Sequence, residues 1–236
     1  MAVKFDFGIK SAFVLRPNTV ERVWTILESA VGSVTAITSC ADNAKREYES
    51  LPQLLAFDNA KVKEIRSLDL TARSKDFKRQ GSVTFGSWSD HIEVTLSAED
   101  EKDISQAREE LRDALDGAKA WYSTISRVDL PKMLLMSLLL LWLVTNITLG
   151  ESSEPRRGVE FGRAVLLALQ VLGVFGAIGL LCWFMWKIHA RYFPRSFFAL
   201  GQGVDRYQID DNMRWVVIIG FVVSVFGSLV VAFVTG

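Results

Sequence analysis

The residues that most often carry enzyme chemistry are few in this sequence, and they lie far apart. The chain has two histidines, His91 and His189, and two cysteines, Cys40 and Cys182. A zinc site needs three or four converging ligands, and nucleophilic catalysis needs a nucleophile, a base and an orienting group in contact. No G-x-S-x-G motif occurs. We therefore predict that the chain is not an enzyme, has no catalytic residues and binds neither a metal nor a cofactor.

A basic segment gives the only candidate ligand site. Arg66, Arg73, Lys78 and Arg79 fall within a short stretch, and such a cluster could bind an anionic ligand such as a nucleotide. The alternative is a solvated surface, because acidic neighbours dilute the charge. The formal net charge of the whole chain is zero, so no nucleic-acid partner is expected.

Two other motifs have structural explanations. The acidic run 99–103 resembles a metal site, but the same charges stabilise the first turn of a helix through its dipole. Gly201-Gln202-Gly203 lacks the third glycine and the preceding strand of a dinucleotide-binding fingerprint. We interpret it as a turn.

Residues 1–130 have the mixed composition of one α+β domain. Period-two alternation predicts strands that begin at Val3 and cover 33–40, the second half of 62–72, 82–85 and 91–96. A further short strand is predicted at 46–49. Apolar residues at helical spacing predict helices over 19–31 and 99–125, and a short helix ends near Phe57. The first helix is expected to open with a capping box of Asn18 and Glu21. One antiparallel sheet with helices on one face makes a two-layer sandwich.

Residues 131–236 are mostly apolar, and three stretches have the composition of membrane-spanning helices. They cover about 133–148, 165–186 and 215–235, and the second has no Asp, Glu, Lys or Arg. About twenty apolar residues match the thickness of a bilayer. The predicted fold class is therefore an N-terminal soluble α+β two-layer domain, 1–130, followed by a membrane domain, 131–236, with three transmembrane α-helices.

Aromatic and basic residues predict where the chain meets a lipid surface. Trp183, Trp186, Arg191, Arg195 and Trp215 are the candidate membrane-interface residues. Lys and Arg are more frequent before the first span and between the last two, which predicts a multi-pass protein of a bacterial inner membrane. Its N-terminus would be cytoplasmic and its C-terminus outside. The segment 187–214 is interpreted either as interfacial or as a loop docked on the α+β domain.

Small residues recur in the last two apolar stretches. Gly173, Gly176 and Gly179 are three residues apart, and Gly220 and Gly227 are seven apart. Such stripes let helix backbones approach closely. They are candidates for packing either within one protomer or between protomers of a homo-oligomer.

These features lead to a functional hypothesis. The α+β domain would bind a cytosolic protein or an anionic small molecule, and binding would be coupled to a self-associating three-helix region in the lipid bilayer, as in a signal-responsive permeabilising effector. The alternatives are a static membrane anchor or scaffold subunit, and a membrane enzyme whose site the sequence does not reveal.

Overall fold

The computed structural model describes residues 3–86, 91–100, 102–129, 132–133, 135–138, 140 and 161–235, and for residues 161–175 it describes the helical backbone only. The elements of the N-terminal part are β1 (Val3–Ile9), β2 (Phe13–Leu15), α1 (Pro17–Ala30), β3 (Ser33–Cys40), β4 (Lys45–Tyr48), α2 (Leu51–Leu55), η1 (Lys61–Lys63), β5 (Ile65–Arg73), β6 (Gln80–Phe85), β7 (Ile92–Ala98), α3 (Lys102–Asp116) and α4 (Ser123–Arg127). The later elements are α6 (Phe161–Tyr192), β8 (Ser196–Phe198) and α7 (Gly203–Thr235).

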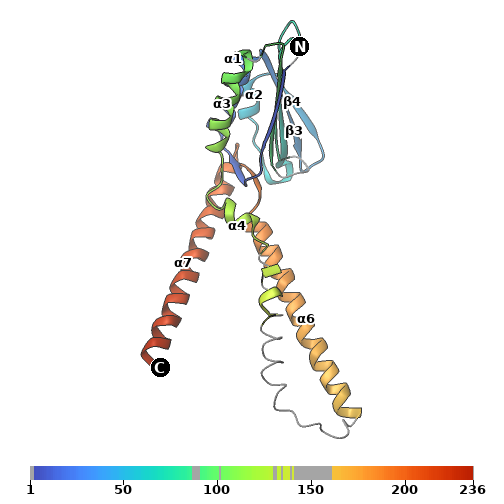
Figure 1. The fold of residues 1–236 in the computed structure, drawn as a ribbon, viewed down its shortest axis with the longest axis vertical. Coiled ribbons are helices and arrows are strands. Elements are labelled where there is room, and N and C mark those ends of the chain that lie inside the picture. Colours follow the sequence, from blue (N-terminus) through green and yellow to red (C-terminus); the bar gives the residue numbers. More distant parts are fainter. Residues whose placement is uncertain are drawn as a thin grey trace. The chain divides into compact units, whose positions relative to one another are not determined.

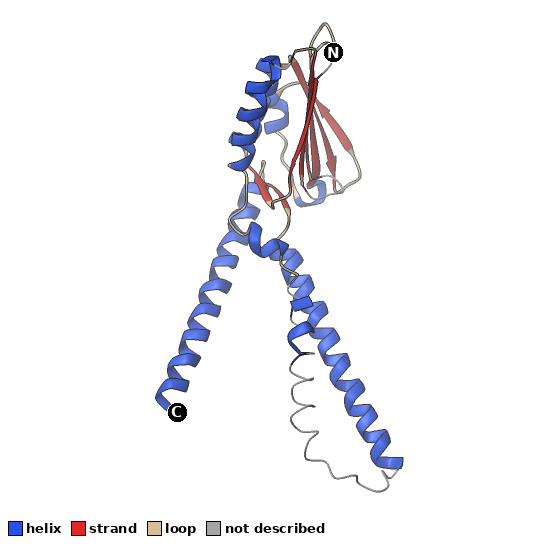
Figure 2. Cartoon of the chain, viewed as in Figure 1, coloured by secondary structure: helices blue, strands red, loops and turns tan. Residues whose placement is uncertain are grey.

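Six strands form one antiparallel sheet in the order β1-β7-β6-β5-β3-β4. The first strand closes one edge by pairing with β7, so that Val3 lies opposite Ala98. Side chains alternate between a buried and an exposed face along these strands, which is the pattern expected when one face of a sheet is covered. Figures 1 and 2 show α1 and α3 on the covered face.

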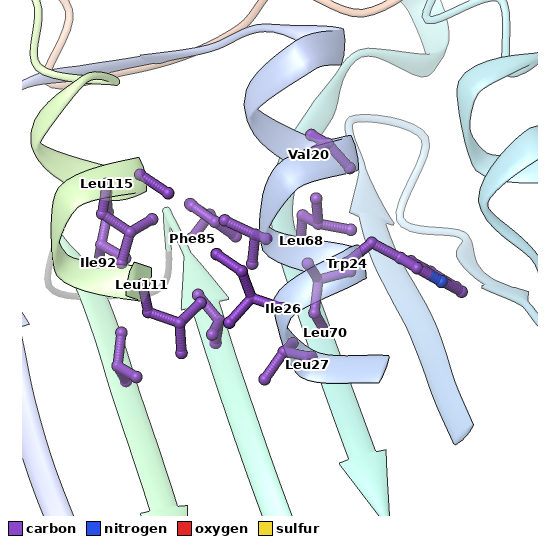
Figure 3. Packing of buried hydrophobic residues seen from close by; sticks show 14 of the residues in the cluster. Val20, Trp24, Ile26, Leu27, Leu68, Leu70, Phe85, Ile92, Leu111 and Leu115 are labelled. Carbon is purple, nitrogen blue, oxygen red and sulfur yellow. The ribbon is translucent and has the colours of Figure 1, made fainter. Parts of the chain in front are cut away.

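The core lies between this sheet and the helices α1 and α3. Val20, Trp24 and Leu27 of α1 and Leu111 and Leu115 of α3 point toward the strands, as Figure 3 shows. Gly81 of β6 allows α1 to come close, because a Cβ added there would lie 3.1 Å from a methyl carbon of Leu27. The predicted two-layer packing of an antiparallel sheet and helices is therefore present in this part of the chain.

A second, two-stranded sheet joins the two ends of the sequence. Strand β2 pairs in parallel with β8, with Val14 opposite Phe197. The ring of Phe13 lies 6.0 Å from that of Phe85 and 6.0 Å from that of Phe198, and Phe13 and Leu15 are fully buried. Residues 196–198 therefore complete the core of the α+β domain.

Asn59 fixes the turn that leads from β8 into α7. Its buried side chain donates to the carbonyl oxygens of Phe198, at 2.9 Å, and Leu200, at 3.1 Å. The Asn59 Oδ1 atom accepts from the backbone N–H of Ile65 at 2.9 Å. The residue has a φ of 47°, which asparagine tolerates better than most residues. One side chain thus ties three separate segments together.

The predicted helix over 99–125 is shorter in the structure. Helix α3 ends at Asp116, and α4 begins at Ser123. Between them, the N–H of Ala120 donates to the carbonyl of Ala12, and the carbonyl of Ala118 accepts from the N–H of Val14. The backbone here bonds to the segment around β2 instead of continuing the helix, and this is why the local apolar spacing overestimated its length.

The described residues fall into two compact units. One contains residues 1–124 and 195–236, and the other contains residues 125–194. In the second unit, α6 carries His189, whose Nε2 atom lies 3.1 Å from the carbonyl oxygen of Ile125. Lys132 forms an ion pair with Asp129 and holds the pKa of that carboxyl below its usual range.

The membrane half of the predicted fold class is contradicted. Among the described residues, no helix combines the length and the apolar character needed to cross a lipid bilayer. The spans predicted at 165–186 and 215–235 are therefore wrong as membrane-spanning segments, and most of the stretch 133–148 lies outside the described residues. The prediction from hydropathy considered only the apolar stretches. In the structure, each helix that contains such a stretch also includes polar residues beyond it. Helix α6 includes Lys187, and α7 begins twelve residues before Trp215, at Gly203.

The predictions that depended on those membrane spans are also wrong. The multi-pass inner-membrane location, the orientation with an outside C-terminus and the integral-membrane effector function are contradicted by the same finding. The segment 187–214 also differs from an interfacial loop. Its first residues end α6, and residues 196–214 form β8 and the start of α7 within the unit that contains the sheet.

Candidate ligand site

A cavity lies where α1 and α7 begin. Its volume is about 500 Å³, and it is lined by Arg16, Pro17, Asn18, Ala199, Val204, Tyr207 and Gln208. The first three residues open α1, and the last three belong to α7. Small-molecule sites commonly have volumes of roughly 300–1,000 Å³. The size of the cavity therefore suits a small ligand held between two helices.

The start of α1 gives one wall a positive potential. Arg16 is the N-cap residue, Pro17 occupies the first turn, and no side chain caps the helix. The predicted capping box of Asn18 and Glu21 is therefore wrong, because proline enters the helix ahead of both residues. The N-terminus of a helix carries a partial positive charge, to which the Arg16 guanidinium adds a full one.

Tyr207 forms the opposite wall and lies between two arginines. The guanidinium of Arg16 is 5.8 Å from the centre of its ring, and that of Arg214 is 5.4 Å away. The ring also packs against Phe197, with 5.4 Å between centroids. Burial raises the pKa of the Tyr207 hydroxyl, so at neutral pH this group is a neutral hydrogen-bonding group.

Behind Tyr207, Arg214 is buried among aromatic rings. It is completely inaccessible to solvent, and its guanidinium lies 4.3 Å from the ring centre of Tyr122. Its Nη1 atom is 3.1 Å from Oδ1 of Asp211, which also accepts a hydrogen bond of 2.9 Å from the indole N–H of Trp121. Burial of the Tyr122 hydroxyl raises its pKa. This cluster anchors the first turns of α7 to the α+β domain.

Trp215, predicted to lie at a lipid interface, belongs to the same cluster. Its ring stacks on that of Trp121, with 5.1 Å between centroids and 20° between planes. Packing within this unit therefore accounts for an aromatic residue at position 215, although the Trp215 side chain is 49% exposed.

A second cavity contains one residue of the predicted basic cluster. It has a volume of about 340 Å³ and is lined by Glu64, Ile65, Arg66, Gly86, Ser196, Phe197 and Phe198. Glu64 and Arg66 carry opposite charges, so this cavity has no net formal charge among its described lining residues. It is less suited to an anion than the cavity beside Arg16.

The four predicted ligand-binding residues do not converge. Arg66 lies at the start of β5, and Arg73 lies at its other end. Lys78 forms an ion pair with Glu99 at 2.8 Å, and Arg79 donates to the carbonyl oxygen of Ala30 at 3.0 Å. The structure thus brings Arg73, Lys78 and Arg79 to the β5–β6 hairpin and leaves Arg66 apart. Whether any of them binds a ligand stays a prediction.

The predicted helix-packing glycines lie on α6 and α7. A Cβ added at Gly176, Gly179, Gly220 or Gly227 would meet no atom within 4 Å among the described residues. Gly173 lies in α6, where only the backbone is described. Their part in helix packing stays a prediction.

The remaining predicted interface residues, Trp183, Trp186, Arg191 and Arg195, are exposed. The ammonium of Lys187 lies 5.1 Å from the ring centre of Trp183, and the carbonyl of Arg195 accepts from the N–H of Phe13.

In the part of the chain that the structure describes, no three His, Cys, Asp or Glu side chains gather as metal ligands would. His91 lies 2.8 Å from Glu93, and neither Cys40 nor Cys182 forms a disulfide. No protein family, curated protein or solved structure matches the chain. The site must therefore be interpreted from its own geometry.

Sequence reasoning missed Arg16 and Tyr207. Pro17 is a signal for a helix start, and it could have placed Arg16 at a positive helix end. Tyr207 carries no comparable signal, because its proximity to Arg16 depends on the pairing of β2 with β8.

Proposed function

We propose that the chain is a non-catalytic binding protein, and that the cavity between the starts of α1 and α7 takes a small anionic ligand. One observation carries the proposal: among the described residues that line this cavity, Arg16 alone carries a formal charge, and it occupies the N-cap position of α1, where no side chain satisfies the helix N-terminus. The ligand class is a small molecule with a carboxylate or phosphate group.

The lining residues offer complementary hydrogen bonds to such a group. The Arg16 guanidinium can donate two parallel hydrogen bonds to a carboxylate or phosphate. The side-chain amides of Asn18 and Gln208 add donors from both helices, and Val204 with Ala199 provides apolar contact. The anion would sit near the positive end of the α1 dipole.

Ligand binding would join two elements that different parts of the sequence supply. Arg16 and Asn18 precede and begin α1, whereas Tyr207 and Gln208 belong to α7. A ligand that contacts both helices favours the arrangement in which they lie together. Tyr207 also touches Arg214, so the same contact would stabilise the anchor of α7.

The test is anion binding by the full-length chain, measured by isothermal titration calorimetry. The probes are inorganic phosphate and glutarate at constant ionic strength. We expect Arg16→Gln to weaken binding of the accepted probe by about 10- to 100-fold, since a hydrogen bond to a charged group contributes about 1.5–3 kcal/mol. Gln208→Glu should weaken it as well, because a carboxylate would face the anion.

Arg22→Gln is the matched control, since Arg22 is exposed on the same helix and lies outside the cavity. The proposal would be refuted if the wild type and Arg16→Gln bound the accepted probe with equal affinity. It would also be refuted if the wild type bound neither phosphate nor glutarate. A loss on Arg66→Gln with no loss on Arg16→Gln would assign the ligand to the second cavity instead.

A further inference from the structure

The second cavity is built by three segments of one compact unit. The start of β5 and the residue before it supply Arg66 and Glu64, the residue after β6 is Gly86, and β8 supplies the rest of the lining. All of these residues belong to the unit that contains the sheet. None of them lines the cavity beside Arg16. The second cavity is therefore a separate candidate site.

A β-bulge places Arg66 at this cavity. The register of β5 against β3 shifts between Ser39 and Cys40, and Arg66 is the residue of β5 that has no partner there. Bulges are frequent beside functional sites, because the local bend re-aims a side chain. Next to the bulge, Gly86 has a φ of 70°, and a Cβ added to it would lie 2.8 Å from the carbonyl oxygen of Arg66. Closely packed backbone thus forms the wall beside Arg66.

Glu64 supplies an opposite charge from a fixed backbone position. Its carbonyl oxygen accepts a hydrogen bond of 2.7 Å from the N–H of Ala41. Its carboxylate lies 3.8 Å from a guanidinium nitrogen of Arg206, which is too far for a hydrogen bond, and its side chain is 45% exposed. Among the described residues, no ion pair joins Glu64 to Arg66. Two opposite charges therefore line one cavity without contacting each other.

We propose that the second cavity binds a small zwitterion, an α-amino acid with an apolar side chain. The Arg66 guanidinium donates two parallel hydrogen bonds to the ligand carboxylate, and the ligand ammonium donates to the Glu64 carboxylate. An anion alone would also face Glu64, and a cation alone would also face Arg66, so a ligand with both charges is favoured over either. The volume of about 340 Å³ is within the range of small-molecule sites.

The rest of the lining favours an apolar side chain on the ligand. Ile65, Phe197 and Phe198 are apolar, and Ser196 is the one uncharged polar side chain among the described lining residues. Phe198 packs edge-on against Phe13 in the core, with 6.0 Å between ring centroids. The aromatic part of the cavity is therefore held in place before a ligand binds, which lowers the entropic cost of binding.

Isothermal titration calorimetry of the full-length chain tests the proposal with three probes that share one carbon skeleton. L-Leucine carries both charges, L-leucine amide lacks the carboxylate, and 4-methylpentanoate lacks the ammonium. The titrated protein carries Arg16→Gln, so that the charge of the first cavity does not contribute. We expect leucine to bind about 10- to 100-fold more tightly than either analogue, because each analogue lacks one hydrogen-bonded charge.

Two substitutions then assign each charge of the ligand to one residue. Glu64→Gln should make leucine and 4-methylpentanoate bind with similar affinity, because the ammonium loses its charged partner. Arg66→Gln should do the same for leucine and leucine amide, because the carboxylate loses its partner. Lys45→Gln is the control, since Lys45 is exposed on β4 and lies outside both cavities. It should keep the full preference for leucine.

The proposal would be overturned if leucine did not bind, or if leucine and both analogues bound with equal affinity. It would also be overturned if Glu64→Gln and Arg66→Gln kept the preference for leucine. The proposed anion binding depends on Arg16 and is measured with phosphate and glutarate in the chain that retains Arg16. Each of the two proposals can therefore fail without the other.

Discussion

Replacing Asn59 by alanine should release the start of α7 from the α+β domain. The substitution removes three hydrogen bonds and leaves the carbonyls of Phe198 and Leu200 and the N–H of Ile65 without their side-chain partner. A buried group that loses its partner costs about 1–3 kcal/mol. Because Gly201 and Gln202 in the adjoining turn are exposed, water can reach part of the site, and we take about 1 kcal/mol for each group.

The backbone adds a further cost. Asn59 has a φ of 47°, and an ordinary L-residue in the left-handed region costs about 1–2 kcal/mol. The sum is about 4 kcal/mol of local stability. Since each 1.4 kcal/mol is a factor of ten, amide hydrogen exchange of the full chain should accelerate by about a thousandfold in β5 and in residues 198–206, as mass spectrometry would detect.

Asn43→Ala is the matched control for this measurement. Asn43 has a φ of 60° but is exposed in the β3–β4 turn, so its substitution tests the backbone cost without the buried hydrogen bonds. We expect about 1–2 kcal/mol from it. If the two variants accelerated exchange equally in their own segments, the three hydrogen bonds of Asn59 would contribute nothing and the reasoning would be refuted.

Two further predictions concern pH and a tight turn. The hydrogen bond from Arg46 lowers the pKa of Asp42 to about 2, so its contribution to stability is present above the unfolded pKa of about 3.9 and is lost as the pH falls toward 2. Asp42→Asn should therefore be less stable than the wild type at pH 5 and equally stable near pH 2 in urea unfolding, and a pH-independent difference would contradict this. Gly201→Ala should cost about 2 kcal/mol or more, because Gly201 has a φ of 49° and an added Cβ would lie 2.5 Å from the carbonyl oxygen of Asp58. Gly117→Ala, where the nearest atom is 3.4 Å away, should change the unfolding free energy by less than about 1 kcal/mol, and similar losses in both variants would exclude the steric explanation.

Local periodicity predicted the strands and helices that depend on the pattern of neighbouring residues in the sequence. The alternation in 3–9, 33–40 and 92–98 follows from one covered face of a sheet, and the structure has β1, β3 and β7 there. Strand β2 was not predicted separately, because all three of its residues are buried and do not alternate. The break after Asp116 was also missed, since its cause is pairing with residues near Phe13.

The candidate site could be predicted only in part. Arg66 was selected for its charge and does line a cavity, but charge along the sequence could not show that Glu64 accompanies it. Arg16 and Tyr207 meet through segments at the two ends of the chain, and no spacing rule connects them. Hydropathy likewise identified the apolar stretches of α6 and α7, but it could not show that the same helices would also include the neighbouring polar residues.

The parallel pairing of β2 with β8 has a consequence for how the protein folds. A ribosome must synthesise all of residues 13–198 before Phe198 can reach Phe13. Until then, the nascent sheet domain exposes the apolar surface that residues 196–200 later cover. Closing so long a loop slows folding and favours chaperone engagement during synthesis. A fragment released after residue 130 should therefore aggregate, even though it contains every strand of the six-stranded sheet.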